Sequence, residues 1–273
     1  MRRVLFLTCC LALSFAACND DKDNPSSENG GYSGDSNGSQ SAVSVYKSGT
    51  ENGYDYVDLA LTSGTRWATM NVGAKNTSDY GNYYAWGETT TKSTYNWNTY
   101  KYMYSCGSYC YQLVKYINYS SHSKDGFTDN KTTLDLSDDV AHVKWGGKWR
   151  MPTKAQQDEL HSECYWVWTD SYNGSEVAGY IVYKAKNSSD KGKSRGTLSS
   201  SYKLSDAHIF LPAAGCCSGG KLYNAGSSGR YWSSSLYTDN NWAYNRDFKS
   251  GYVGGGYEER CFGQSVRAVI PGE

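Results

Sequence analysis

The sequence has no excess of charge of either sign. Its 273 residues include 27 lysine and arginine residues and 27 aspartate and glutamate residues, so the formal net charge is +0. A neutral chain has no long-range electrostatic field that would attract nucleic acid or an anionic membrane surface. The composition therefore predicts a protein that does not bind nucleic acid.

The sequence also lacks the spacings that hold metal ions. Its four histidines are scattered, and no paired CxxC or HExxH spacing is present. His161 and Cys164, three residues apart beside Glu163, come nearest to a ligand set. A surface histidine next to a buried cysteine accounts for this spacing more simply. We therefore predict no metal ion, no cofactor and no catalytic set of residues.

Aromatic residues, in contrast, are abundant. The chain has 26 tyrosines and 9 tryptophans but only 6 phenylalanines. Tyrosine and tryptophan are amphipathic, and they are enriched on surfaces that bind partners. They also fit the half-buried positions of β-strands. The composition alone leaves both interpretations open.

The N-terminal apolar run is too short to span a bilayer, which takes about 20 residues. Two arginines precede residues 4–17, an arrangement typical of a signal peptide. The run ends in Phe15-Ala16-Ala17-Cys18, which resembles a bacterial lipobox with phenylalanine where leucine is commoner. The resemblance implies that residues 1–17 are a lipoprotein signal peptide and that Cys18 is lipidated. We therefore expect the chain to be attached to a membrane by a lipid anchor.

The segment after Cys18 is polar. Its first residues, Asn19-Asp20-Asp21-Lys22-Asp23, resemble the surface-export signal of Bacteroidota lipoproteins. Residues 18–42 hold almost nothing to bury, so we predict a flexible tether. We expect the folded domain, residues 43–273, to be anchored in the outer membrane and to face the cell exterior.

The first of two predicted helices lies in the stretch of residues 134–168. Asp138 and Asp139 favour a helix start, because the N-terminus of a helix attracts negative charge. Gly146-Gly147 ends this helix, since glycine readily adopts the left-handed conformation of a helix C-cap. Its predicted apolar edge consists of Val140, Val143 and Trp145.

The second predicted helix follows a tryptophan-rich turn. Thr153 is a strong N-cap, and Gln156 three residues later completes a capping box. The helix is predicted to run to about Cys164, with Leu160 and Cys164 on one face.

The rest of the chain is predicted to form strands and loops. Residues 53–73 have the pattern of a hairpin, and the later predicted strands are residues 179–184, 207–213, 231–235, 243–248 and 266–270. Residues 89–131 are predicted to be a long surface insertion. The predicted loops are residues 187–201 and 215–229. The predicted core includes Trp149, Leu160, Phe210, Leu211 and Trp232.

Six motifs occur in an order that resembles one family. They are VDLALTSGTRWATMNVGA, YGNYYAWGET, LDLSDDVAHVKWGGKWRMPTKAQQDEL, IFLPAAG, GRYWSSS and SVRAV. Residues 54–269 thus resemble the Fibrobacter succinogenes major paralogous domain family, which is common in Bacteroidota surface lipoproteins. The resemblance implies an α+β, C-type-lectin-like fold with two short helices and a mainly antiparallel, twisted sheet. It implies little about activity. Gln157 departs from the pattern, which usually has an aromatic residue there, so we expect that helix to pack less tightly.

The cysteines raise an enzymatic alternative. A more distant resemblance to formylglycine-generating enzymes implies a reactive cysteine pair, although the cysteines here do not match that pattern. An oxidising compartment permits disulfides, and six cysteines allow 15 connectivities. A disulfide between Cys106 and Cys110 would form most easily, whereas adjacent cysteines such as Cys216 and Cys217 rarely form a disulfide with each other. The six cysteines that follow Cys18 are Cys106, Cys110, Cys164, Cys216, Cys217 and Cys261.

Lectin-type calcium sites use carboxylate and amide ligands around a proline. The sequence has no EPN, QPD or WND tripeptide. Asp135, Asp138 and Asp139 are better interpreted as residues of a helix start. A structural calcium ion is an alternative for these carboxylates.

Residues 237–262, YTDNNWAYNRDFKSGYVGGGYEERCF, are the predicted ligand-binding stretch. In lectin-like folds this stretch lies on the ligand-facing side, and its composition is similar to that of stretches diversified by retroelement mutagenesis. Exposed rings would stack on a glycan or anchor a protein partner. Ordinary long loops favour the same polar residues, so a structural or adhesion protein without a small ligand is another alternative. The candidate residues are Tyr237, Asn240, Asn241, Trp242, Tyr244, Asn245, Arg246, Asp247, Tyr252 and Tyr257, and the aromatic run of residues 80–86 is the next candidate.

The lipobox resemblance generates a direct test. Cys18→Ala should abolish acylation and release the protein from membranes, as measured by fractionation and by incorporation of labelled fatty acid. Replacing Asp20, Asp21 and Asp23 by Ala should leave the protein lipidated but protected from protease on intact cells. Unchanged membrane retention of Cys18→Ala would contradict the anchor.

Overall fold

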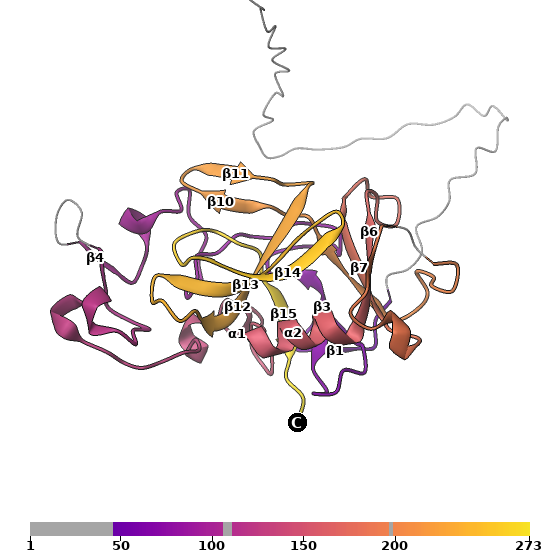
Figure 1. The fold of residues 1–273 in the computed structure, drawn as a ribbon, viewed down its shortest axis with the longest axis horizontal. Coiled ribbons are helices and arrows are strands. Elements are labelled where there is room, and N and C mark those ends of the chain that lie inside the picture. Colours follow the sequence, from indigo (N-terminus) through magenta and orange to yellow (C-terminus); the bar gives the residue numbers. More distant parts are fainter. Residues whose placement is uncertain (1–45, 106–110, 197–198) are drawn as a thin grey trace, which may run out of the picture. The chain divides into compact units, whose positions relative to one another are not determined.

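The computed structural model describes residues 46–105, 111–196 and 199–273 (Figure 1). The predicted signal peptide, Cys18 and the tether lie outside the described residues, as do Cys106 and Cys110. The described residues belong to one compact unit. Within the described ranges, no helix combines the length and the apolar run that crossing a membrane requires.

The first sheet joins the beginning of the domain to its end. Its strand order is β1-β2-β3-β15, all antiparallel. The pairing of β2 with β3 confirms the predicted hairpin, and it places Val57 opposite Trp67. The strands of this sheet are β1 (Gly49–Glu51), β2 (Tyr54–Asp58), β3 (Arg66–Asn71) and β15 (Arg267–Ile270).

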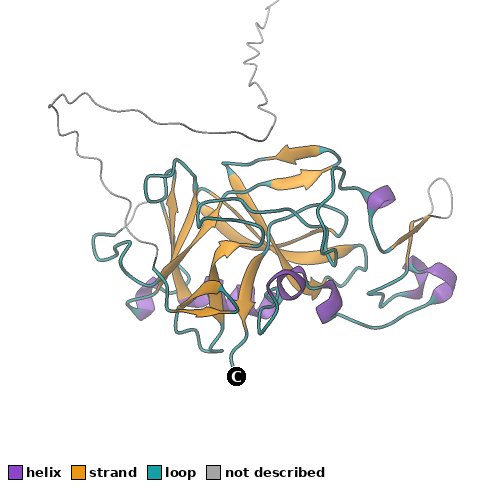
Figure 2. Ribbon diagram, turned by 180° about the vertical axis from the view of Figure 1, so that it is seen from behind, coloured by secondary structure: helices purple, strands orange, loops and turns teal. Residues whose placement is uncertain are grey.

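A second sheet has the order β8-β6-β7-β9, in which only the short β8 is parallel to its neighbour. A third has the order β12-β13-β14. The second sheet comprises β6 (Cys164–Thr169), β7 (Gly179–Lys184), β8 (Ser194–Arg195) and β9 (His208–Pro212). The third comprises β12 (Ser228–Leu236), β13 (Trp242–Lys249) and β14 (Tyr252–Glu259). Strands dominate the described part of the domain (Figure 2).

Two small hairpins complete the strands, and both occupy segments predicted as irregular. They are β4 (Met103–Ser105) with β5 (Tyr111–Leu113), and β10 (Cys216–Ser218) with β11 (Lys221–Tyr223). The predicted loop of residues 215–229 therefore contains a hairpin, and the predicted loop of residues 187–201 contains β8. Both loop predictions were wrong in part because strands of two or three residues are too short for alternation to show.

Both predicted helices are present, as α1 (Val140–Trp145) and α2 (Lys154–Glu163). The Asp139 side chain caps α1 by accepting from the His142 N–H, and Gly146 ends it with a φ of 68°. The predicted capping box of Thr153 and Gln156 is confirmed. The short 3-10 helices are η1 (Trp97–Thr99), η2 (Ser120–His122), η3 (Lys124–Gly126), η4 (Leu136–Asp138) and η5 (Ser188–Asp190).

Two expectations about these helices need correction. Val143 is exposed, because the buried side of α1 is formed by Val140, Ala141 and Trp145. Gln157 is buried, and its amide donates to the carbonyls of Tyr231 and Trp232. These hydrogen bonds satisfy a buried polar group, so α2 is attached to β12 where we expected looser packing.

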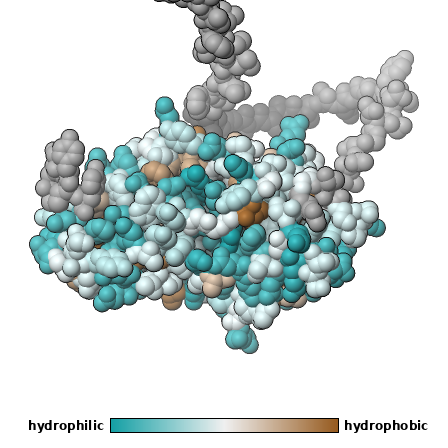
Figure 3. Space-filling model, viewed as in Figure 1, coloured by the Kyte–Doolittle hydropathy of each residue, from teal (hydrophilic) through white to brown (hydrophobic). Residues whose placement is uncertain are grey.

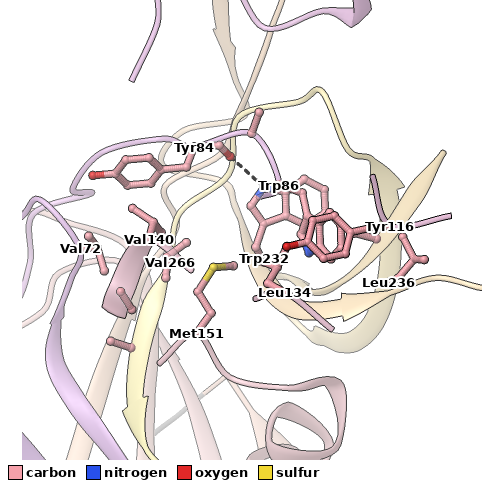
Figure 4. Packing of buried hydrophobic residues seen from close by; sticks show 14 of the residues in the cluster. Val72, Tyr84, Trp86, Tyr116, Leu134, Val140, Met151, Trp232, Leu236 and Val266 are labelled. Carbon is pink, nitrogen blue, oxygen red and sulfur yellow. Dashed lines mark hydrogen bonds between the residues drawn. The ribbon is translucent and has the colours of Figure 1, made fainter. Parts of the chain in front are cut away.

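The predicted core is confirmed. Trp149, Leu160, Phe210, Leu211 and Trp232 are all buried. Figure 4 shows the cluster around Trp232, in which its indole N–H donates to the Tyr84 carbonyl at 2.9 Å. A buried indole needs such an acceptor, because an unpaired buried donor destabilises the fold.

The segment of residues 89–131 is not a surface insertion, as we had predicted. Tyr95, Tyr100, Tyr102 and Tyr116 from this segment are buried in the same cluster as Trp86. Their rings fill the core while their hydroxyls find polar partners, such as the Trp86 carbonyl, 2.7 Å from Tyr100 Oη. The polar composition of the segment predicted a surface position. Tyrosine, however, can bury its ring in the core while its hydroxyl forms a hydrogen bond, so a tyrosine-rich segment can be polar and still belong to the core.

The core assignment can be tested at Trp232. Trp232→Ala should lower the free energy of unfolding by about 3–5 kcal/mol, because it opens a large cavity and removes the hydrogen bond to Tyr84. Leu222→Ala is the control, since Leu222 is exposed and should change stability by less than about 0.5 kcal/mol. Urea denaturation measures both, and equal effects would contradict this core.

Candidate ligand-binding surface

The predicted ligand-binding stretch forms a hairpin rather than a long loop. Strands β13 and β14 pair antiparallel, with Tyr244 opposite Tyr257 and Lys249 opposite Tyr252. A short turn at Gly251 connects them, and its φ of 77° suits glycine. Because side chains alternate along a strand, the candidate residues are divided between two faces of this hairpin.

The sheet of β12, β13 and β14 passes between two hydrophobic clusters. At the start of β13, Ala243 packs in the cluster of Trp86 and Trp232. At its end, Phe248 packs on the opposite face, in the cluster of Tyr180. Each half of the hairpin therefore has a covered face and an open face, and the open faces point to opposite sides. This arrangement creates two separate candidate surfaces.

The first surface is an aromatic platform formed by four rings. Tyr237 and Tyr257 stack with centroids 4.1 Å apart and planes 22° apart. Tyr244 meets the Tyr237 ring edge-on at 5.0 Å, and Trp242 meets the Tyr257 ring edge-on at 5.5 Å. Tyr257 is 50% exposed, and the other three side chains are partly exposed. The four rings therefore reach the surface as one packed cluster.

Helix α2 supports the base of the platform. It contacts β12 and β13 (Figure 1). The Lys154 ammonium lies 5.3 Å from the centroid of the Tyr244 ring, a cation–π distance. Asp158 accepts from Lys154 and from the buried Arg246, the latter at 2.7 Å. Burial alone would raise the pKa of Asp158, but these two cations hold it below its ordinary value of 3.8.

Three of the polar candidates have buried side chains that form hydrogen bonds within the protein, and a fourth is bonded through its backbone. Asn240 is buried, accepting from the Asn118 N–H at 2.9 Å and donating to the Tyr119 carbonyl at 3.2 Å. Buried Asn245 donates to Gln264, and buried Arg246 donates to Asp158. Asn241 is held through its backbone, which donates to Asp239 and accepts from the Arg260 N–H. We had predicted ligand contacts for all four, and this was wrong for Asn240, Asn245 and Arg246, whose side chains point into the protein, whereas the Asn241 side chain is partly exposed and its predicted contact stays a prediction.

The second surface is a polar cleft of about 480 Å³ on the other face of the hairpin. Asp247 and Tyr252, both candidates, belong to it. Arg230 donates to Glu258 at 2.7 Å, and its Nε lies 3.8 Å from Asp247. The residues that line the cleft include Asn224, Ser228, Arg230, Asp247, Lys249 and Tyr252. Sequence reasoning missed Arg230, Lys249, Asn224 and Ser228, because only the pairing of β12 with β13 brings them beside Asp247.

Elsewhere on the described surface there are smaller pockets, such as one of about 360 Å³ that Tyr54, Tyr84 and Trp145 help to line. On the face of the described residues that Figure 3 draws, apolar residues form scattered spots rather than a broad patch. The aromatic run of residues 80–86, our next candidate, contributes Tyr84 and Trp86 to the core. Trp86 is fully buried and is not available to a ligand, whereas the Tyr84 side chain, although only 2% exposed, lines the pocket beside Trp145.

The described cysteines offer no reactive thiol pair. Cys164, Cys216, Cys217 and Cys261 are free, so among the described residues no disulfide forms. Burial raises the pKa of all four thiols, and that of Cys217 reaches about 11. A thiol with a raised pKa stays protonated at neutral pH and is a poor nucleophile.

The predicted helix-start carboxylates are occupied by protein donors. Asp139 caps α1, and Asp138 accepts from Lys101, Lys115 and Tyr116. Asp135 accepts from Lys131. Within the described ranges, no three histidine, cysteine or acidic residues come together as metal ligands would.

Comparison of the chain with family models, curated proteins and solved structures finds no match. The resemblance to the major paralogous domain family thus stays a prediction.

The support of the platform can be tested at Asp158. Asp158→Asn should lower the free energy of unfolding by about 1–3 kcal/mol at pH 7, because Arg246 would stay buried without its anionic partner. The pKa of Asp158 is lowered in the folded protein, so its contribution is present above pH 3.8 and is lost as pH falls further. Urea denaturation from pH 7 to pH 3 should therefore show the difference from the parent shrinking below about pH 4.

Glu273→Gln is the matched control, because the Glu273 side chain is 90% exposed. It should change stability by less than about 0.5 kcal/mol at every pH. If Asp158→Asn stays less stable than the parent by the same free energy of unfolding down to pH 3, the assigned ion pair is contradicted.

Proposed function

We propose that this chain is a non-catalytic binding protein that holds a glycan or a protein partner on its aromatic platform. The observation that carries the proposal is the cluster of four partly exposed rings, Tyr237, Trp242, Tyr244 and Tyr257, on a single surface. Aromatic side chains of this kind dominate binding energy where they occur at the centre of a contact.

The platform is organised before any ligand arrives. Ring stacking fixes Tyr237 on Tyr257, and the Asn240 hydrogen bonds fix the loop that precedes β13. Side chains that are already ordered lose little conformational entropy on binding. A preorganised platform thus supports recognition without a metal ion or a covalent step.

We further propose that the domain is C-type-lectin-like and that Cys18 anchors it to the outer membrane, facing the exterior. Two short helices and mainly antiparallel strands agree with the fold that the family resemblance implies. The apolar N-terminal run that ends at Cys18 supports the anchor. A binding domain on a lipid tether would meet ligands outside the cell.

The two alternatives receive less support. A formylglycine-generating-like enzyme needs reactive cysteines, and burial keeps the described thiols protonated. A purely structural surface protein would not need a cluster of partly exposed aromatic rings, since those rings leave apolar area in water.

The platform is tested by substitution of two of its rings, Trp242 on β13 and Tyr257 on β14. A glycan array and affinity capture from the exterior of cells identify the partner of the parent chain. Replacing Trp242 and Tyr257 by Ala should then weaken binding of that partner at least tenfold, or about 1.4 kcal/mol, because both rings lose their contacts.

Phe127→Ala is the control, since the Phe127 ring is 49% exposed and belongs neither to the platform nor to the residues that line the polar cleft. It should bind the platform partner as the parent does. Unchanged binding by the Trp242 and Tyr257 double variant would place the partner elsewhere on the surface.

A further inference from the structure

The polar cleft is an open depression with the volume of a small-ligand site. Its volume of about 480 Å³ falls within the range of about 300–1,000 Å³ typical of such sites. Its walls come from the turn after β11, from the start of β12 and from the hairpin of β13 and β14. The cleft lies on the face opposite the aromatic platform, so the two surfaces share no ring.

Several polar side-chain groups in the cleft make no hydrogen bond to the described protein. Among the described residues, no side chain or backbone group donates a hydrogen bond to the Asp247 carboxylate, and its nearest cation is Arg230 Nε at 3.8 Å. The Lys249 ammonium and the Tyr252 hydroxyl likewise make no hydrogen bond within the described ranges. Carboxylate, ammonium and hydroxyl groups thus face the same space with their hydrogen-bonding capacity free.

The charges of the cleft are balanced. Arg230 and Lys249 are cationic, while Asp247 and Glu258 are anionic, and Glu258 is the direct partner of Arg230. A site for an anion or a cation would carry an excess of the opposite charge. The balance therefore favours a neutral ligand that both donates and accepts many hydrogen bonds.

Tyr252 supplies a flat wall beside these groups. Its ring folds back over Gly254, and a Cβ built at Gly254 would overlap the Tyr252 hydroxyl and lie 3.2 Å from its Cε1. Glycine at position 254 is thus what allows the ring to lie along the strand. The Tyr252 side chain is 46% exposed and is one of the residues that line the cleft.

We propose that the polar cleft binds a neutral saccharide, which stacks on Tyr252 and donates hydroxyl hydrogen bonds to Asp247. A carboxylate accepts from two neighbouring hydroxyls at once, and Lys249 and Arg230 donate to other sugar oxygens. The apolar face of a sugar ring covers an aromatic ring, which keeps water from that contact. This site is additional to the platform and does not depend on it.

The test uses the full chain and a panel of uncharged mono- and disaccharides, with glucuronate and glucosamine as charged probes, in calorimetric titrations. At least one neutral saccharide should bind with a Kd below about 10 mM and more tightly than either charged probe. Gly254→Ala and Asp247→Asn should each weaken that binding at least tenfold. Tyr252→Phe, which keeps the ring, should bind within about threefold of the parent.

Folding of each variant is checked by thermal denaturation. Asp247→Asn alters a partly exposed side chain that accepts no protein hydrogen bond, so it carries the test if Gly254→Ala proves unstable. The Trp242 and Tyr257 double variant should bind the saccharide as the parent does. Loss of saccharide binding in that double variant with retention in Asp247→Asn would overturn the proposal, as would tighter binding of a charged probe or no binding of any neutral saccharide.

Discussion

The buried guanidinium of Arg260 joins more distant parts of this chain than any single side chain around the platform. It is fully buried, and within the described residues it has no carboxylate partner. It donates to Tyr100 Oη and to the carbonyls of Lys115, Tyr116 and Asn240, and it lies 4.9 Å from the ring centroid of Trp86. Backbone oxygens and aromatic rings thus take the place of a counterion, and a charge buried in this way requires every donor to be satisfied.

This arrangement connects the platform to the middle of the chain. Asn240, whose carbonyl accepts from Arg260, also holds the backbone of Asn118 and Tyr119 through its side chain. The loop that begins at Tyr237 is therefore fixed by residues more than a hundred positions earlier in the sequence. Arg267 plays a similar part on the other side of the domain, where it donates to Asn71 and to the carbonyls of Ala68 and Phe210. Burial lowers the pKa of Arg267 to about 10, which still leaves it charged at neutral pH.

Local signals in the sequence predicted the helices and the hairpin of β2 and β3. The capping box of Thr153 and Gln156 and the C-cap at Gly146 depend on residues only a few positions apart, so they can be seen without the fold. Strand β14 was missed because Gly254, Gly255 and Gly256 dilute its strand signal. Pairing with β13 along its whole length overrides that low propensity.

Only some residues of the candidate site could be predicted, because the others depend on contacts between distant parts of the chain. The aromatic residues Trp242 and Tyr257 were correctly expected to reach the surface, since turn-forming residues surround them. The inward direction of Asn240, Asn245 and Arg246 depends on partners 122, 19 and 88 residues away. A local sequence pattern cannot predict hydrogen bonds between residues this far apart in the chain. The tyrosines of residues 89–131 were misjudged because a tyrosine with a buried ring and a bonded hydroxyl has the same sequence signature as an exposed one.

The opposite orientation of Tyr257 and Tyr252 on β14 has a consequence for valency. A ligand bound to the aromatic platform would leave the polar cleft uncovered, because the two surfaces lie on opposite faces of β14. Binding at one surface would therefore not sterically exclude binding at the other. Both surfaces move with one rigid hairpin, which fixes the distance between whatever they hold. Ligands held on the two proposed surfaces would therefore be cross-linked through one hairpin, and capture by one surface would raise the local concentration of material at the other.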